Sequence, residues 1–260
     1  MTRLYAGVPT RPSCNPGAGS RTVPEDEDMP TDAAPGSLAR RAWSRDLSWW
    51  ARDYVYAVAA QLRAIGAGRP DGLVSGTKRP LVLLPGIYET WRFLEPLAEA
   101  LHERGHPVHV VAGLGANRRP VIESAGRVVD LIVERELDDL VLVAHSKGGL
   151  IGKHVMAFDP VGERVRAMVA VATPFRGSRY SSLMPAPSLR AFRSGDATMR
   201  ALAASAEVNT RIVSVYGAFD PHIPEGSELA GARNIRLDAG GHFRVLADPR
   251  VIAEVVRAAE

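Results

Sequence analysis

The sequence predicts a three-layer α/β domain with a mostly parallel sheet, and three observations support this prediction. Six short apolar runs recur from about residue 79 onward, and helix-like segments lie between most of them. Several runs are apolar on both faces, as expected of central strands that helices cover on both sides. The alternation of strand and helix is the pattern of α/β domains. The 260 residues suffice for one large domain with an appendage.

Composition and charge exclude several classes of protein. The single cysteine, Cys14, excludes an internal disulfide framework and a Cys-based zinc site. The formal net charge of +3 is too balanced to favour nucleic acid as a partner. No apolar run reaches about 18 residues, and the start of the chain lacks the pattern of a secretory signal. We therefore expect a cytoplasmic protein.

The first part of the chain predicts a tail followed by a helix. Residues 1–36 lack apolar periodicity and hold many Pro, Gly, Thr and Asp residues, which is typical of a disordered tail. Residues 37–66 are expected to form an amphipathic helix that Ser37 caps. Its apolar residues recur every three or four positions and share one face: Trp43, Leu47, Trp50, Tyr54, Val58, Leu62 and Ile65.

Two interpretations of this apolar face remain open. The first is that the face packs against the main domain. The second is a peripheral membrane contact, in which the helix lies on lipid. The tryptophans and five arginines favour this alternative: Arg40, Arg41, Arg45, Arg52 and Arg63.

The remaining elements follow in order along the chain. Strands are expected at 81–84, 108–111, 140–144, 166–172, 211–216 and 233–238. Helices are expected at 91–104, 120–136, 148–158 and 249–258. In parallel sheets, functional groups gather at the carboxyl ends of strands, so candidate residues are sought there.

The segment around Ser146 combines a buried strand, a serine and a helix start. The run 140–144 leads into His145 and Ser146, and Gly148 and Gly149 open the next segment. A serine on so tight a turn projects its hydroxyl from the edge of the sheet, and small residues are needed on both sides of it. The following helix directs its free N–H groups and positive end at the serine, which suits a developing oxyanion.

This segment, Ala144-His145-Ser146-Lys147-Gly148, resembles the nucleophile elbow G-x-S-x-G of the α/β-hydrolase family, including bacterial lipases and esterases. It departs from that pattern at Ala144, which replaces the first glycine. The resemblance covers about residues 79–258. It implies an α/β-hydrolase domain over 79–260 and the chain order serine, acid, histidine.

A serine nucleophile needs a base and a carboxylate that orients the base. His242 follows the last expected strand, where this family places its base, whereas His222 is expected to be a solvated loop residue. Asp220 lies in the pattern Gly217-x-x-Asp220-x-x-x-Pro224, which matches the family's acid loop. Other carboxylates near these loops remain rivals for the acid: Glu225 and Asp238.

The same resemblance implies an oxyanion hole and a cap. The two N–H donors are those of Lys147 and, by analogy with the Pro-Gly loop of lipases, Ile87. A cap insertion is expected at about 175–207, and it begins with a segment similar to the T-P-x-x-G-S of bacterial lipases. Apolar residues of the cap and the loop are expected to bind an acyl group: Tyr88, Phe175, Leu183 and Met184.

Together these features predict a serine hydrolase that cleaves carboxylic esters, with lipid-like acyl esters favoured. No cofactor and no metal is required by this chemistry. One alternative keeps the same three residues but acts as an acyltransferase or thioesterase. Another is a non-catalytic binding protein of the same fold.

Overall fold

The computed structural model describes residues 35–65, 70–182, 189 and 192–260. The tail expected over residues 1–36 lies almost entirely outside the described residues. Within them, no helix is long and apolar enough to cross a membrane.

The core of the molecule is a six-stranded sheet in the order β2-β1-β3-β4-β5-β6, and all neighbouring strands run parallel. The predicted α/β class and its parallel sheet are therefore confirmed. The strands are β1 (Leu81–Leu84), β2 (Val108–Val110), β3 (Leu140–His145), β4 (Val165–Val171), β5 (Ile212–Phe219) and β6 (Arg233–Gly240).

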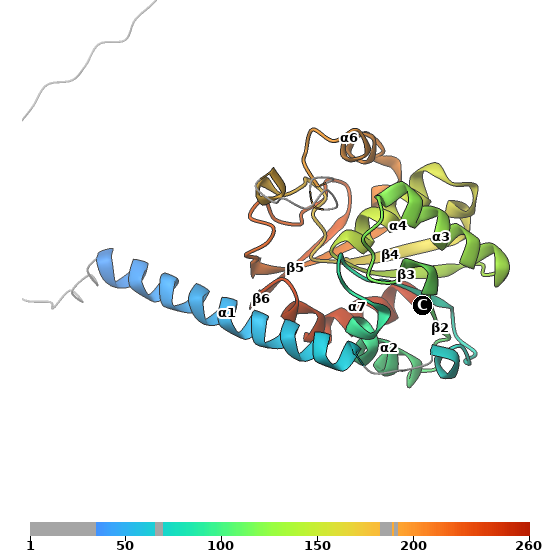
Figure 1. The fold of residues 1–260 in the computed structure, drawn as a ribbon, viewed down its shortest axis with the longest axis horizontal. Coiled ribbons are helices and arrows are strands. Elements are labelled where there is room, and N and C mark those ends of the chain that lie inside the picture. Colours follow the sequence, from blue (N-terminus) through green and yellow to red (C-terminus); the bar gives the residue numbers. More distant parts are fainter. Residues whose placement is uncertain (1–34, 66–69, 183–188, 190–191) are drawn as a thin grey trace, which may run out of the picture.

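Helices cover both faces of this sheet (Figure 1). One face carries α3 (Val121–Glu134), α4 (Lys147–Phe158) and α6 (Ala197–Ala204). The other carries α1 (Pro35–Ala64), α2 (Glu95–His102) and α7 (Pro249–Ala259). Strands β1 and β3 are buried along their whole length because both of their faces are covered, which explains their continuous apolar runs. The segment between β4 and β5, where a cap is expected, contains α6 and the short 3₁₀ helix Arg179–Ser182.

The order of the strands creates a crevice between β1 and β3. The chain passes from β1 to β2 on one side and then crosses to β3 on the other side. The connections after these two neighbouring strands therefore leave toward opposite faces of the sheet, and such a switch point is where ligands bind in open α/β sheets. Pro85–Tyr88 follows β1 and Ser146 follows β3, so both reach this crevice.

Helix α1 packs on the domain through a face that its apolar pattern does not predict. Leu47, Val58 and Leu62 of the apolar face are more than half exposed, so the interpretation in which the whole face packs on the domain is wrong. Its Tyr54 edge, by contrast, contacts the domain at His222. Over residues 46–64, where the side chains of α1 are described, the buried ones are those of Asp53 and Ala60. Small Ala60 permits close approach, and Asp53 hydrogen-bonds to backbone groups of the domain, so neither contributes a strong apolar signal.

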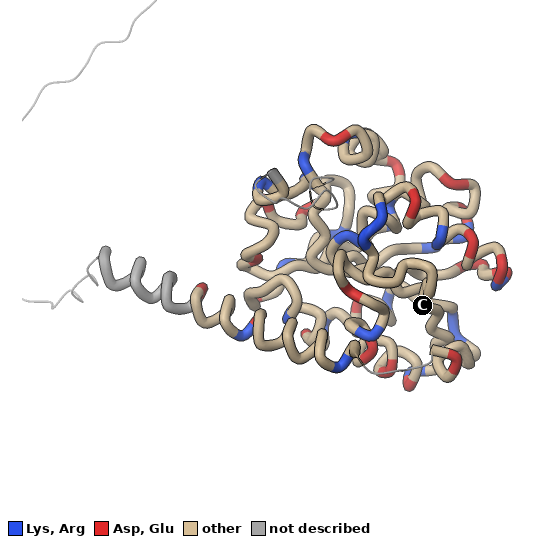
Figure 2. The backbone as a smooth tube through the Cα atoms, in the orientation of Figure 1, with Lys and Arg blue, Asp and Glu red and all other residues tan. Residues whose placement is uncertain are grey.

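Basic and acidic residues are interspersed along the backbone of the main domain (Figure 2). This distribution agrees with the small net charge of +3.

Candidate active site

Ser146 lies on a strained turn between β3 and α4. Its φ of 50° and ψ of −118° are rare for a residue with a side chain. A Cβ atom at position 148 would lie 2.0 Å from the carbonyl oxygen of Leu84, and one at position 149 would lie 2.1 Å from Oγ1 of Thr173. Glycine at both positions therefore lets α4 start directly beneath the ends of β1 and β4.

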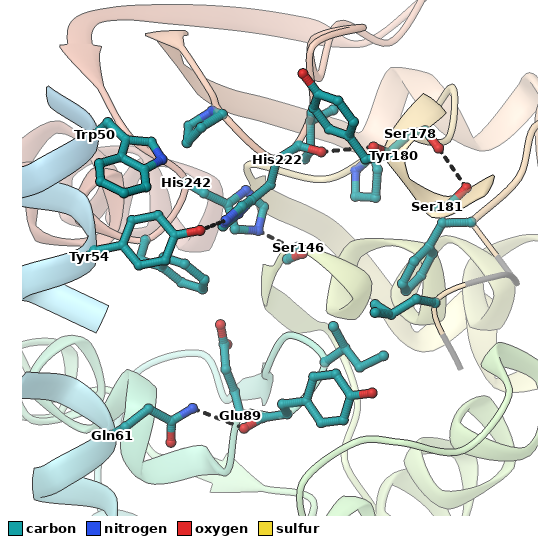
Figure 3. A pocket seen from close by; sticks show the side chains of 18 residues that line it. Trp50, Tyr54, Gln61, Glu89, Ser146, Ser178, Tyr180, Ser181, His222 and His242 are labelled. Carbon is teal, nitrogen blue, oxygen red and sulfur yellow. Dashed lines mark hydrogen bonds between the residues drawn. The ribbon is translucent and has the colours of Figure 1, made fainter. Parts of the chain in front are cut away.

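Three side chains from separate loops form one hydrogen-bonded relay. Nε2 of His242 is 3.0 Å from Oγ of Ser146 (Figure 3), and Nδ1 of His242 is 2.8 Å from Oδ2 of Asp220. All three side chains are almost completely buried. The residues predicted as nucleophile, base and acid are thus brought together, although they come from loops that follow β3, β6 and β5.

Asp220 is held as the partner of His242 by its own loop. Its Oδ1 accepts the backbone N–H groups of His222 at 2.8 Å and Ile223 at 3.0 Å, which leaves Oδ2 for the imidazole. The rival carboxylates lie elsewhere, because Glu225 pairs with Arg179 at 2.8 Å and Asp238 is exposed.

Burial and charge act in opposite directions on this pair. Burial alone would lower the pKa of His242, but the negative charge and hydrogen bond of Asp220 outweigh burial and raise it. Burial would likewise raise the pKa of Asp220, but the facing His242 and the backbone N–H of His222 lower it. The relay therefore favours a carboxylate at 220 and a basic imidazole at 242.

His222 lies in the site rather than in solvent, which corrects the expectation of a solvated loop residue. Its Nε2 is 3.1 Å from the hydroxyl of Tyr54, and its ring lies 5.0 Å from the ring of His242 (Figure 3). Burial and the nearby His242 lower the pKa of His222 to about 4, so the ring is neutral at pH 7. No local sequence pattern predicts this contact, because the partner of His222 comes from α1.

A buried pair, Glu89 and His145, lies next to the relay and contacts the loops on either side of it. Glu89 accepts the N–H of Gly86 at 2.7 Å and lies 2.9 Å from Nδ1 of His145. Nε2 of His145 lies 3.1 Å from the carbonyl oxygen of His242. The pair links the loop after β1 to the loop that carries His242.

The side chain of Lys147 points away from the relay and fixes a neighbouring loop. Its Nζ donates to the carbonyl oxygen of Asn117 at 2.8 Å and also to the carbonyl oxygen of Arg119. Asn117 in turn donates to the carbonyl oxygen of Pro85 at 2.7 Å. Burial lowers the pKa of Lys147 to about 8. Lys147 is the first residue of α4, so its backbone N–H has no partner within the helix.

A cavity of about 390 Å³ opens above Ser146 and His242. Ile87 and Tyr88 line it, as does Leu189 of the expected cap. Phe175 was predicted to bind substrate but is packed in the core instead, because the adjacent Pro174 turns toward the cavity. The predicted contacts Leu183 and Met184 lie outside the described residues. Among the described residues, no cluster of three or more His, Cys, Asp and Glu side chains could hold a metal ion.

Helix α1 forms one wall of this cavity, which the sequence analysis did not anticipate. Trp50, Tyr54 and Gln61 face the opening (Figure 3). Nε2 of Gln61 donates to the carbonyl oxygen of Tyr88 at 3.0 Å, so α1 also contacts the loop after β1. The spacing of Trp50 and Tyr54 was visible in the sequence, but the domain that they face was not.

By sequence, the chain matches no protein-family model and no curated protein. Solved structures do resemble it. A Bacillus licheniformis lipase, BlEst2, is 14% identical with a TM-score of 0.54, over 74% of this chain and 94% of that one. A structure reported for the metagenome-derived lipolytic enzymes LipS and LipT is 13% identical with a TM-score of 0.55, over 71% and 94%.

An extracellular α/β-hydrolase from a Paenibacillus species is 22% identical with a TM-score of 0.50, over 70% of this chain and 98% of that one. At these identities the likeness concerns the fold. The strand order and the structural neighbours together lead to one conclusion: the chain has the α/β-hydrolase fold.

Proposed function

We propose that this protein is a serine hydrolase that cleaves carboxylic esters, with lipid-like acyl esters as its preferred substrates. The observation that carries the proposal is the relay from Asp220 through His242 to Ser146, with hydrogen-bond distances of 2.8 and 3.0 Å. A serine hydroxyl becomes a competent nucleophile when an oriented base can accept its proton.

The reaction begins when Oγ of Ser146 attacks the ester carbonyl carbon and Nε2 of His242 accepts the hydroxyl proton. The carbonyl oxygen becomes an oxyanion, for which the N–H groups of Ile87 and Lys147 are the donors in this proposal. His242, held by Asp220, then protonates the departing alkoxide as the carbon–oxygen bond breaks. Water attacks the acyl-enzyme in the same way, and its proton passes through His242 back to Ser146.

The lining of the cavity supports an apolar acyl group. Ile87, Phe192 and Ile223 surround the opening above Ser146, and the cavity is largely apolar. One structural neighbour is a lipase, and another comes from a report on two lipolytic enzymes. Their likeness to this chain concerns the fold, so the preference for lipid-like esters rests on the cavity.

The test begins with p-nitrophenyl esters of increasing acyl length and purified full-length protein. We expect hydrolysis by the wild type and its loss in Ser146→Ala. The melting temperature of the variant should equal that of the wild type. A fluorophosphonate probe should label the wild type and Ser178→Ala, which removes a second serine from the same cavity, but not Ser146→Ala. Turnover that survives in Ser146→Ala would refute the assignment.

The same assay separates the alternatives. If a competing alcohol captures most of the acyl group in place of water, the protein is an acyltransferase. If acyl thioesters are cleaved much faster than oxygen esters, it is a thioesterase. If Ser146 is not labelled and no ester is cleaved, the fold serves as a binding protein.

A further inference from the structure

Helix α1 contacts the loop that carries His242 through a buried carboxylate. From this contact we infer that Asp53 is a positioning residue, which holds the loop of His242 so that the imidazole stays within hydrogen-bonding distance of Ser146. The inference rests on the proposed function, in which His242 is the base.

The contact consists of three backbone hydrogen bonds to a single side chain. Oδ2 of Asp53 accepts the N–H of His242 at 2.9 Å. Oδ1 accepts the N–H groups of Phe243 and Arg244, each at 2.8 Å. Asp53 is completely buried, so water cannot replace these bonds. Hydrogen bonds to a charged acceptor are among the stronger ones in proteins.

The two residues before His242 have no side chain where the loop lies against α1. A Cβ atom at position 241 would lie 2.4 Å from Oδ1 of Asp53, and one at position 240 would lie 2.3 Å from the ring of Trp49. The φ of 120° at Gly241 is also a conformation that favours glycine. The two glycines before His242 therefore allow α1 to approach the backbone closely enough for Asp53 to bind it.

Asp53 also contributes charge to the base. The groups that face His242 are the carboxylates of Asp220, Glu89 and Asp53 and the rings of His222 and His145. The negative charge of Asp53 is one of the causes that raise the pKa of His242. Loss of that charge should lower this pKa, whereas a change that only weakened the fold would leave it in place.

The experiment compares Asp53→Asn and Asp53→Ala with Asp46→Asn in the full chain. Asp46 lies on the same helix and makes none of the contacts to the loop. In Asp53→Ala we expect kcat to fall on the order of 100-fold with little change in KM, because a small displacement of a base has such an effect. Asp53→Asn keeps one acceptor oxygen and should recover part of this loss. Asp46→Asn should behave as the wild type.

A second readout does not depend on turnover. In a Ser146→Ala background, the pKa of the His242 imidazole is measured by NMR with and without Asp53→Asn. We expect a lower pKa in the Asp53 variant and, in active protein, an acid limb of kcat/KM that moves to lower pH. A folded Asp53→Asn protein with an unchanged kcat and His242 pKa would overturn the inference. Absence of hydrolysis in the wild type would instead refute the proposed function, while the NMR comparison would still decide the role of Asp53.

The outer face of α1 carries a second inference from a different observation. Five apolar side chains lie there between 57% and 80% exposed: Leu47, Val55, Val58, Leu62 and Ile65. Arg52 and Arg63 are also exposed and lie about three turns apart, on one side of the helix. An apolar stripe bordered by arginines is the pattern of helices that lie in the interface of anionic membranes. We propose that this face docks on an anionic lipid surface.

The position of the stripe agrees with this partner. Trp50 and Tyr54 lie next to it on α1, are partly exposed and also line the cavity above Ser146. Aromatic residues with a polar atom favour the level of the lipid headgroups. A docked helix would therefore place the opening of the cavity beside the membrane surface.

Flotation with vesicles tests this proposal on the full chain. We expect binding to phosphatidylcholine vesicles that contain phosphatidylglycerol, weaker binding to phosphatidylcholine alone, and at least tenfold weaker binding for Val58→Glu. Ile122→Glu is the matched control, because Ile122 on α3 is also 57% exposed. Equal binding by the two variants, or no binding by the wild type, would overturn the proposal. A dimer that Val58→Glu dissociates, without vesicle binding, would assign the face to a second copy of the chain.

Discussion

At Ser146 the unusual backbone conformation depends on the residues around it. The carbonyl oxygen of Leu84 lies where a side chain at position 148 would begin, and the serine N–H donates to the carbonyl oxygen of Val171 at 2.8 Å. The strained turn is therefore held from both neighbouring strands, β1 and β4. Such strain persists only where the surrounding structure determines it.

This argument predicts a large effect of Gly148→Ala. The added methyl group would overlap a backbone oxygen that cannot move without shifting β1, so we expect a loss of about 3 kcal/mol or more in the free energy of unfolding and loss of ester hydrolysis. Urea denaturation and p-nitrophenyl ester turnover measure the two effects.

Gly126→Ala is the control for this substitution. A Cβ atom at position 126 in α3 would meet no atom within 4 Å, so alanine should stabilise the helix by about 0.5–1 kcal/mol. Equal stability of the two variants would show that the turn at Ser146 tolerates a side chain at 148.

At the scale of elements, the loop after β1 is held by a buried polar network. Asn117 donates to the carbonyl oxygen of Pro85 and accepts from Nζ of Lys147 at 3.1 Å. Oγ of Ser124 in α3 donates to the same amide oxygen at 3.3 Å. Asn117 is completely buried and has a φ of 49°, a conformation that asparagine tolerates better than most residues. The loop that carries Ile87 thus depends on a residue about thirty positions away.

Asn117→Ala should therefore weaken both the fold and the reaction. It leaves the carbonyl oxygen of Pro85 and the ammonium group of Lys147 each without one buried partner, for which we expect about 2–3 kcal/mol of lost stability. The loop that carries Ile87 should also become less well placed, which lowers kcat more than it raises KM. Thermal or urea unfolding, together with steady-state kinetics, measures these changes.

Ser124→Ala provides the comparison for the same network. It removes only the longest hydrogen bond of the group, so the expected loss is below about 1 kcal/mol, with little effect on kcat. If Asn117→Ala were no more harmful than Ser124→Ala, the network would have no part in positioning the loop.

At the scale of the whole molecule, the relay depends on three loops and one helix that are far apart in the sequence. Ser146, Asp220 and His242 follow three different strands, and Asp53 reaches the last loop from α1. The pKa of His242 is therefore a property of the assembled molecule, since burial lowers it and charges from separate elements raise it.

The pH dependence of hydrolysis follows from the direction of this shift. The base must be neutral to accept the proton of Ser146, so activity is lost as the pH falls through the pKa of His242. Because this pKa is raised, the acid limb of kcat/KM should have its midpoint above about 6.5. A midpoint well below 6.5 would contradict the charge arrangement around His242.

The same shift has a consequence for stability with the opposite dependence on pH. The folded state binds a proton at His242 more tightly than the unfolded chain does. The stabilisation of the folded state by His242 is fully present below about pH 6.5 and is lost as the pH rises through the raised pKa. The lowered pKa of His222 acts the other way, because its contribution is present above about pH 6.5 and is lost as the pH falls toward about 4.

The sequence by itself determined the order of strands and helices and the positions of Ser146, Asp220 and His242. The strands are short runs that are buried on both sides, so their composition is uniform and easily recognised. The three site residues follow strand ends, and parallel strands bring such ends to one edge of the sheet. Local pattern and topology were therefore sufficient for this part of the protein.

Only the tertiary structure decided what α1 does. Periodicity identifies an apolar face but not its partner, and the face that packs on the domain carries the buried Asp53 and Ala60, with Tyr56 and Trp49 beside them, outside the apolar stripe. His222 and Glu89 were likewise hidden, because their partners, Tyr54 and His145, come from distant segments. A buried polar contact depends on two groups meeting in space, and neither group carries a signal of that meeting in its own stretch of sequence.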